Sequence, residues 1–139
     1  MGLLGLRPGN PLPQGGQRIA VMVQSGSGSA DAWTKMFGPA FERCGITLYP
    51  GSLNLWAAEE IFWDNPVTIS TSAGTGEFCP VILEECAVGV AFRKNTETPR
   101  YLETLAPVRL RDRLNLSDGQ RMSVRLLPGR ALDSCLART

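Results

Sequence analysis

The sequence predicts a mainly β protein: a small barrel with one principal helix and a short second helix. Most of its apolar runs are short, alternate with polar residues or are rich in β-branched residues, and end at Gly, Pro, Asn or Ser, which is typical of strands joined by turns. Residues 32–43 instead carry apolar side chains at the spacing of an amphipathic helix. A chain of 139 residues suits a single domain with one sizeable core.

The first predicted strand covers residues 19–23, an apolar run rich in β-branched residues and followed by Ser-Gly repeats. The helix predicted next, over 32–43, contains Gly38-Pro39, so we expect a kink or two short pieces. Gly45 is well suited to end this helix, because glycine readily adopts the left-handed conformation found there.

Beyond residue 52 the chain reads as β-structure joined by turns. Strands are predicted over 53–56, 67–71, 78–84, 87–92, 101–105 and 121–127. Loops are predicted over 72–76 and 93–100, a short helix over 108–114, and a tight turn at 117–119. Six or seven short strands with one principal helix favour a small barrel.

The ends of the chain differ in composition from its middle. Residues 1–17 are rich in Gly and Pro and have little hydrophobic periodicity, so we expect a flexible N-terminal arm. The barrel domain should cover 18–128, and 129–139 should form a C-terminal tail.

The composition restricts the class of partner. The hydrophobic fraction of 43% and charged fraction of 19% are ordinary for a soluble globular protein. A net charge of +1 gives no electrostatic reason to expect nucleic acid or an anionic membrane as the main partner. The chain has no apolar run near the roughly 20 residues of a membrane-spanning helix, and its first residues lack the features of a signal peptide. We expect a cytoplasmic protein.

Cysteine and histidine usage excludes several chemistries. Cys44, Cys79, Cys86 and Cys135 form no C-x-x-C pair, and we expect buried or incidental thiols in a reducing compartment. A bridge between Cys79 and Cys86 across a hairpin is the alternative. The chain has no histidine, which excludes Ser-His-Asp hydrolysis, Cys-His chemistry and histidine-ligated zinc.

Two segments carry candidate chemistry. Ser52 and Asn54 follow the turn Pro50-Gly51, and their hydroxyl and carboxamide oxygens are hard ligands that suit Mg²⁺ bound to substrate phosphates. The second segment, 105–112, passes through Ala-Pro and then offers two arginines and backbone amides, which suit phosphate groups. The sequence therefore indicates a metal–nucleotide site. The alternative is that the serine and asparagine only cap a turn and the arginines form a solvated helix face.

A third segment, 25–30, is a Ser-Gly run that would by itself suggest a flexible linker. Its position between a predicted strand and a predicted helix favours another interpretation. Glycines in such a turn let backbone amides approach a phosphate closely.

These segments, in this order, resemble the archaeal CTP-dependent riboflavin kinase family over roughly residues 18–127. The resemblance rests on 50–55 (Pro-Gly-Ser-Leu-Asn-Leu, where the family usually has Gly-Thr-Leu-Asn), on 103–112, and on the closing Leu-x-Asp-Gly pattern near 116–119. It implies a six-stranded cradle-loop barrel that transfers the γ-phosphate of CTP to riboflavin, with Mg²⁺ as cofactor. The partners implied are a nucleotide and a small-molecule substrate, riboflavin or a related alcohol.

The resemblance also implies roles for individual residues. Mg²⁺ would be held by Ser52, in the place of the family's threonine, and by Asn54. The nucleotide would be contacted by Gly26, Ser27, Gly28, Ser29, Ala30, Asp31, Val108, Arg109, Leu110 and Arg111. The flavin would be contacted by Thr96 and Glu103. Trp56, Phe62 and Trp63 are interpreted as core or lid residues and not as a flavin-stacking platform.

Phosphoryl transfer depends mostly on positioning and charge neutralisation, so the lack of histidine is no obstacle. The expected catalytic residues are Glu103, which would orient the acceptor hydroxyl, and Arg109 and Arg111, either of which would offset charge on the transferred group. The alternatives are a non-catalytic nucleotide- or flavin-binding regulatory barrel and a kinase for a different small alcohol.

Overall fold

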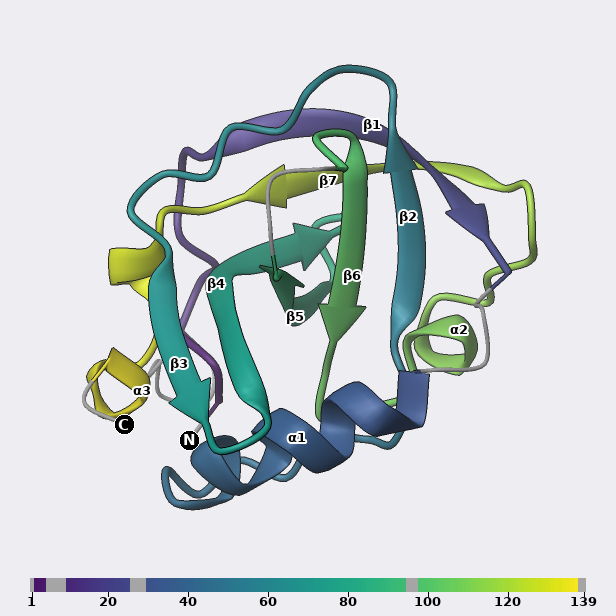
Figure 1. Ribbon diagram of the computed structural model, residues 1–139. Coiled ribbons are helices and arrows are strands. Elements are labelled where there is room, and N and C mark those ends of the chain that lie inside the picture. The colour runs from purple at the N-terminus through teal and green to yellow at the C-terminus, as the bar shows by residue number, and fades with distance from the viewer. Residues whose placement is uncertain (1, 5–9, 26–29, 95–97, 138–139) are drawn as a thin grey trace.

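The structure is a computed structural model that describes residues 2–4, 10–25, 30–94 and 98–137 (Figure 1). Its strands are β1 (Gln17–Gln24), β2 (Leu53–Ala57), β3 (Val67–Thr71), β4 (Gly74–Leu83), β5 (Ala87–Arg93), β6 (Tyr101–Leu105) and β7 (Arg121–Leu126). Its helices are α1 (Ala30–Glu42), α2 (Leu110–Arg113) and α3 (Ser134–Ala137), with a 3-10 turn, η1 (Gly129–Ala131), before α3. None of the helices in the described part of the chain is long and apolar enough to cross a membrane.

Six antiparallel strands close into a barrel, in the order β4-β5-β6-β2-β1-β7. The barrel closes because the second half of β4 pairs with β7, with Val81 opposite Leu126 and Leu83 opposite Val124. The first half of β4 extends beyond the barrel and pairs with β3, which is a seventh strand outside the closed ring (Figure 1). The predicted mainly β, six-stranded barrel with a principal helix and a short second helix is confirmed, and α3 is an additional short helix.

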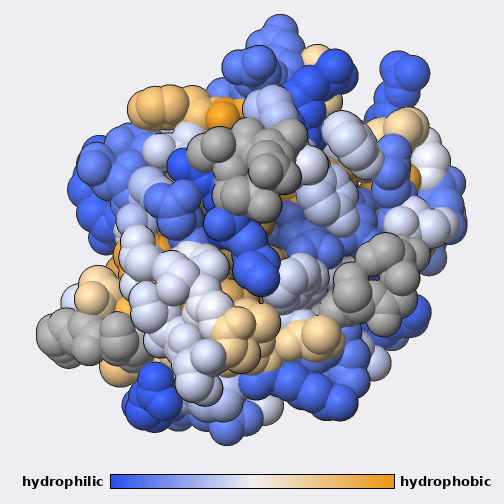
Figure 2. All heavy atoms as spheres, in the orientation of Figure 1, coloured by the Kyte–Doolittle hydropathy of each residue, from blue (hydrophilic) through white to orange (hydrophobic). Residues whose placement is uncertain are grey.

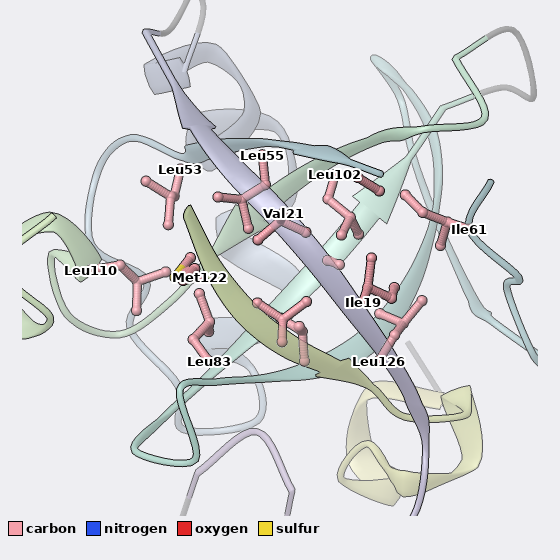
Figure 3. Packing of buried hydrophobic residues seen from close by; sticks show 14 of the residues in the cluster. Ile19, Val21, Leu53, Leu55, Ile61, Leu83, Leu102, Leu110, Met122 and Leu126 are labelled. Carbon is pink, nitrogen blue, oxygen red and sulfur yellow. The ribbon is translucent and has the colours of Figure 1, made fainter. Parts of the chain in front are cut away.

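Hydrophobic side chains fill the barrel and also cover part of its outer face. Alternate residues of a strand point to opposite faces, so Leu53 and Leu55 of β2 enter the interior, where they meet Val21, Leu102 and Met122 (Figure 3). A second buried cluster lies where α1 packs on the outer face of the barrel. There the rings of Phe37 and Phe78 meet edge to face, with centroids 5.0 Å apart.

Helix α1 runs as one helix through Gly38-Pro39, so the expected division into two pieces is wrong. Pro39 is on the exposed side of the helix, where water can hydrogen-bond the carbonyl that the missing proline N–H leaves unpaired. Gly45 ends the helix as predicted. It has φ of 78°, and the N–H of Ile46 returns to the Phe41 carbonyl at 2.9 Å.

The loop predicted over 72–76 is also wrong, because β4 already begins at Gly74. Only a tight turn separates β3 from β4, and the Thr71 hydroxyl accepts hydrogen bonds from the N–H groups of Ala73 and Gly74, each at 3.2 Å. Gly76 is needed for packing: a Cβ there would lie 2.9 Å from Cζ of Phe37. Gly76 thus makes room for Phe37 of α1 and does not mark a long loop.

The described residues near the two chain ends lie together. Leu3 is only 2% exposed, and its carbonyl accepts a hydrogen bond from the Asp133 N–H at 2.7 Å. A disulfide joins Cys44, after α1, to Cys135 in α3, so the expectation of thiols is wrong for these two cysteines. Cys79 and Cys86 do not form the alternative bridge; the first is buried and the second exposed. The division into arm, barrel and tail stays a prediction.

Candidate nucleotide and acceptor site

A cleft of about 250 Å³ lies between the two segments that the sequence singles out. It is lined by residues 49–53 on one side and by Thr104, Ala106 and 108–111 on the other. The start of β2 and the end of β6 lie side by side near α1 and α2 (Figure 1), with Leu53 opposite Thr104. The N–H of Tyr49 donates to the carbonyl of Ala106 at 2.8 Å, which joins the two segments directly.

Two hydroxyl groups in this cleft lack a hydrogen-bond partner within the described part of the chain. The side-chain oxygens of Ser52 and Thr104 are buried, and neither has a hydrogen bond to any residue that the structure describes. A buried hydroxyl without a partner costs about 1–3 kcal/mol, so such groups are rare unless a ligand or water satisfies them. Ser52 is therefore available for the predicted role of a Mg²⁺ ligand.

Asn54 lies on the outer face of β2, between the core residues Leu53 and Leu55, and is 4% exposed. Its Oδ1 accepts a hydrogen bond from the Tyr101 hydroxyl. A carboxamide oxygen has two lone pairs, so this bond is compatible with a metal-ligand role. Asn54 does not line the cleft that contains Ser52.

Arg111 lines the cleft and is held by groups on two other segments. Its Nη2 donates to the carbonyl of Gln24 at 3.1 Å and to Oδ1 of Asp118 at 2.6 Å. Asp118 also accepts a hydrogen bond from the Ser25 hydroxyl at 2.5 Å, and these bonds from Ser25 and Arg111 lower the pKa of the Asp118 carboxyl. Sequence reasoning assigned Asp118 to a turn only. The structure shows that it fixes an arginine of the cleft.

Arg109 is more loosely held than Arg111. Its Nη1 pairs with Asp112 at 2.7 Å, and half of its side chain is exposed. Val108 is exposed, whereas the side chain of Leu110 is buried in the barrel core, so Leu110 offers a ligand mainly its backbone. The cleft therefore combines two guanidinium groups with a short run of backbone amides, a set that suits phosphate oxygens.

The predicted nucleotide residues Gly26, Ser27, Gly28 and Ser29 lie outside the described residues. The chain on both sides of them reaches the cleft. Before them, Ser25 bonds Asp118, the partner of Arg111. After them, Ala30 begins α1, the exposed Asp31 pairs with Lys35 at 3.3 Å, and the Thr34 hydroxyl accepts a hydrogen bond from the Gly51 N–H at 3.1 Å.

A second pocket, of about 270 Å³, lies on the outer face of β5 and β6. It is lined by Trp33, Phe92, Arg93, Lys94, Thr98, Tyr101 and Glu103. Burial raises the pKa of the Glu103 carboxyl, and hydrogen bonding with Trp33 and Tyr101 partly opposes this rise. Burial, and then the nearby Glu103, raise the pKa of Tyr101.

The register of the barrel connects this pocket to the first cleft. Asn54 stands opposite Glu103 across the β2–β6 pair, and Glu103 stands opposite Phe92 across the β5–β6 pair. Glu103 is therefore flanked by Asn54, the predicted metal ligand, on one side and by the apolar Phe92 on the other. The next residue in the chain, Thr104, lines the first cleft.

Of the aromatic residues that line the second pocket, Trp33 comes from α1, and sequence reasoning assigned it only to a helix face. Its ring lies 5.6 Å from that of Phe92, and the Lys94 ammonium lies 5.0 Å from its centroid. Its place in the first turn of α1, directly after a glycine-rich segment, is a signal that could have identified it. The predicted flavin contact Thr96 lies outside the described residues, and Thr98, two residues later in the sequence, lines the pocket.

The three aromatic residues discussed from sequence do not line this pocket. Trp63 is 8% exposed and its ring stacks against the Arg93 guanidinium, in agreement with a core role. Trp56 and Phe62 are exposed. On the face seen in Figure 2, hydrophilic side chains predominate and hydrophobic ones form small separate groups.

Comparison with known proteins gives one informative result. No protein-family model matches the chain. The chain is 32% identical, over 94 residues, to a protein named riboflavin kinase from Methanobrevibacter smithii. The match covers 60% of this chain and 76% of that protein.

Proposed function

The chain belongs to the riboflavin kinase family, and on this premise we propose that it transfers the γ-phosphate of CTP to riboflavin, with Mg²⁺ as cofactor, to give FMN and CDP. The observation that carries the proposal is a cleft lined by two arginines and by two buried hydroxyls that have no partner among the described residues, next to a pocket lined by the half-buried Glu103. The choice of CTP among nucleotides rests on the family resemblance of 50–55 and 103–112.

The triphosphate is proposed to lie in the first cleft. The guanidinium groups of Arg109 and Arg111 and the amides of 108–111 would bind its oxygens, and the Asp118–Arg111 ion pair would keep one guanidinium in place. The chain that enters and leaves the Ser-Gly segment borders the same cleft. Loss of one charge-stabilising donor costs roughly 3–4 kcal/mol of barrier in enzymes that work in this way.

Ser52 and Asn54 are the residues that would hold Mg²⁺, with most of the remaining positions taken by water and phosphate oxygens. The Ser52 hydroxyl, which is buried and has no hydrogen-bond partner among the residues that the structure describes, supports this assignment. The cation, when bound, would neutralise charge on the β- and γ-phosphates.

Riboflavin is proposed to bind in the second pocket, with its ring system against Trp33 and Phe92. Glu103 would accept a hydrogen bond from the terminal hydroxyl of the ribityl chain. This bond would direct the hydroxyl oxygen toward the γ-phosphorus. A new P–O bond then forms, the bond to the β,γ-bridging oxygen breaks, and CDP leaves with that electron pair. The raised pKa of Glu103 makes its carboxylate a better acceptor for the hydroxyl proton than an exposed glutamate would be.

The test is to incubate the protein with riboflavin, MgCl₂ and either CTP or ATP, and to measure FMN by chromatography. The same mixtures with EDTA control for the metal. FMN from CTP, and not from ATP or with EDTA, is the expected result. FMN only from ATP would contradict the donor. Binding of nucleotide without product would instead support a regulatory barrel, and phosphorylation of another alcohol alone would contradict the acceptor.

A further inference from the structure

Tyr101 projects from β6 on the same face of the sheet as Glu103, two residues later in the strand. Across the β2–β6 pair it stands opposite Trp56, and it is diagonal to Asn54. Diagonal neighbours in an antiparallel pair lie about 7–8 Å apart, a span that an aromatic side chain can cover.

The side chain of Tyr101 covers this span, and its hydroxyl contacts both neighbours. It donates a hydrogen bond to Oδ1 of Asn54 and lies 3.4 Å from Oε1 of Glu103. Its ring is supported by Trp56, with the two centroids 5.5 Å apart. One oxygen atom therefore lies between the side chain proposed to hold the cation and the side chain proposed to orient the acceptor.

We propose that Tyr101 is a positioning residue whose hydroxyl fixes the Asn54 carboxamide and the Glu103 carboxylate relative to each other, so that the cation and the acceptor hydroxyl are brought into register. This inference rests on the proposed function. A carboxamide and a carboxylate each rotate about their last side-chain torsion, which is broad and poorly fixed without a partner. The hydroxyl has one proton and both oxygens are acceptors, so it restricts both rotations by bonding Asn54 Oδ1 while lying near enough to Glu103 Oε1 to share that proton with it.

Tyr101 lies apart from the proposed nucleotide contacts. Tyr101 lines the second pocket and not the cleft that contains Arg109 and Arg111. Loss of its hydroxyl should therefore alter the dependence on the cation and on the acceptor together, and leave the dependence on the nucleotide nearly unchanged.

The experiment compares wild type with Tyr101→Phe, which removes one oxygen and keeps the ring that contacts Trp56. Loss of a group that orients a metal ligand typically costs about 10–100-fold in metal affinity or activity. We expect the Mg²⁺ concentration at half-maximal rate to rise about tenfold or more, and the KM for riboflavin to rise several-fold. The KM for CTP should stay within about twofold.

The matched control is Thr68→Val, which removes an exposed hydroxyl from β3, outside the barrel. It should change none of these constants. Riboflavin binding, followed by fluorescence quenching, and Mn²⁺ binding in the presence of CTP, followed by EPR, provide readouts that do not depend on turnover. Both should weaken in Tyr101→Phe.

The outcomes distinguish the positioning role of Tyr101 from the proposed riboflavin kinase activity. Unchanged Mg²⁺ and riboflavin dependences in Tyr101→Phe, or a lower kcat alone together with a lower Tm, would overturn the positioning role while the wild type still makes FMN. A wild type that forms no FMN would overturn the proposed function. The positioning role is then decided by the two binding assays, and a wild type that binds neither ligand would overturn it as well.

Discussion

Replacement of Ser52 by alanine should have opposite effects on stability and on activity. In the protein without ligands the Ser52 hydroxyl is buried and has no hydrogen-bond partner among the described residues. Such a group costs about 1–3 kcal/mol, so Ser52→Ala should be at least as stable as wild type and gain on the order of 1 kcal/mol. For a domain of this size that gain raises Tm by roughly 3–5 °C.

The same substitution removes one proposed ligand oxygen from the cleft. We expect the rate of FMN formation at low Mg²⁺ to fall by about 100-fold or more, since loss of a single stabilising group at the reacting phosphates has effects of this size. Thermal unfolding with and without Mg²⁺ and CTP, and chromatography of FMN over a Mg²⁺ series, measure the two effects. In wild type the ligands should raise Tm; in Ser52→Ala they should raise it less.

Ser123→Ala, at an exposed position of β7, is the control and should alter neither quantity. Two results would refute the reasoning. A clear loss of stability in ligand-free Ser52→Ala would mean that the hydroxyl has a partner in the protein. An unchanged Mg²⁺ dependence would mean that Ser52 does not contact the cation or the phosphates.

Three further predictions concern the fold. Gly89→Ala should lower the free energy of unfolding by about 1–3 kcal/mol, because a Cβ there would lie 2.7 Å from a methyl group and 3.0 Å from a carbonyl oxygen of β6; Gly38→Ala, with no atom within 4 Å, should be neutral or stabilising in urea unfolding. The pKa of Glu85 is lowered chiefly by hydrogen bonds from an arginine of β7. The contribution of Glu85 to stability is therefore present above the unfolded pKa of about 4.3 and is lost as pH falls through the folded pKa. The difference in urea midpoint between wild type and Glu85→Gln should shrink in acid, and a difference that does not depend on pH would contradict this. Burial raises the pKa of Cys79 to about 12, so in the native protein at pH 8 a thiol reagent should label the exposed Cys86 and leave Cys79 unmodified until urea is added.

The local patterns predicted most of the strands, because the packing of each strand against the core sets a hydrophobic pattern within that strand. Residues 67–71 and 101–105 alternate in hydrophobicity, and they form β3 and β6 with those bounds. The glycine-rich stretch after β3 misled the prediction, because one of its glycines, Gly76, is needed for a close contact with Phe37, which is distant in sequence. The disulfide between Cys44 and Cys135 joins residues 91 apart, and no local pattern indicates it.

In the candidate site too, residues in local motifs could be predicted, and contacts between distant segments could not. Ser52 and the arginines could be predicted to share a cleft, because two short motifs in a fixed order carried the family resemblance, and the cleft is present. The roles of Asp118 and Tyr101 could not be predicted. Asp118 contacts Arg111 of α2, and Tyr101 contacts Asn54 of β2, and no local sequence pattern indicates either contact.

The most direct test of the central claim is to locate the metal–nucleotide on the protein. Mn²⁺ accepts the same oxygen ligands as Mg²⁺, and its unpaired electrons broaden NMR signals of nearby nuclei. With Mn²⁺ and CTP added to the isotope-labelled protein, the amide signals of Ser52, Thr104 and Arg111 should broaden first, while those of β3 stay sharp. Broadening centred away from the cleft, or none that depends on CTP, would contradict the account.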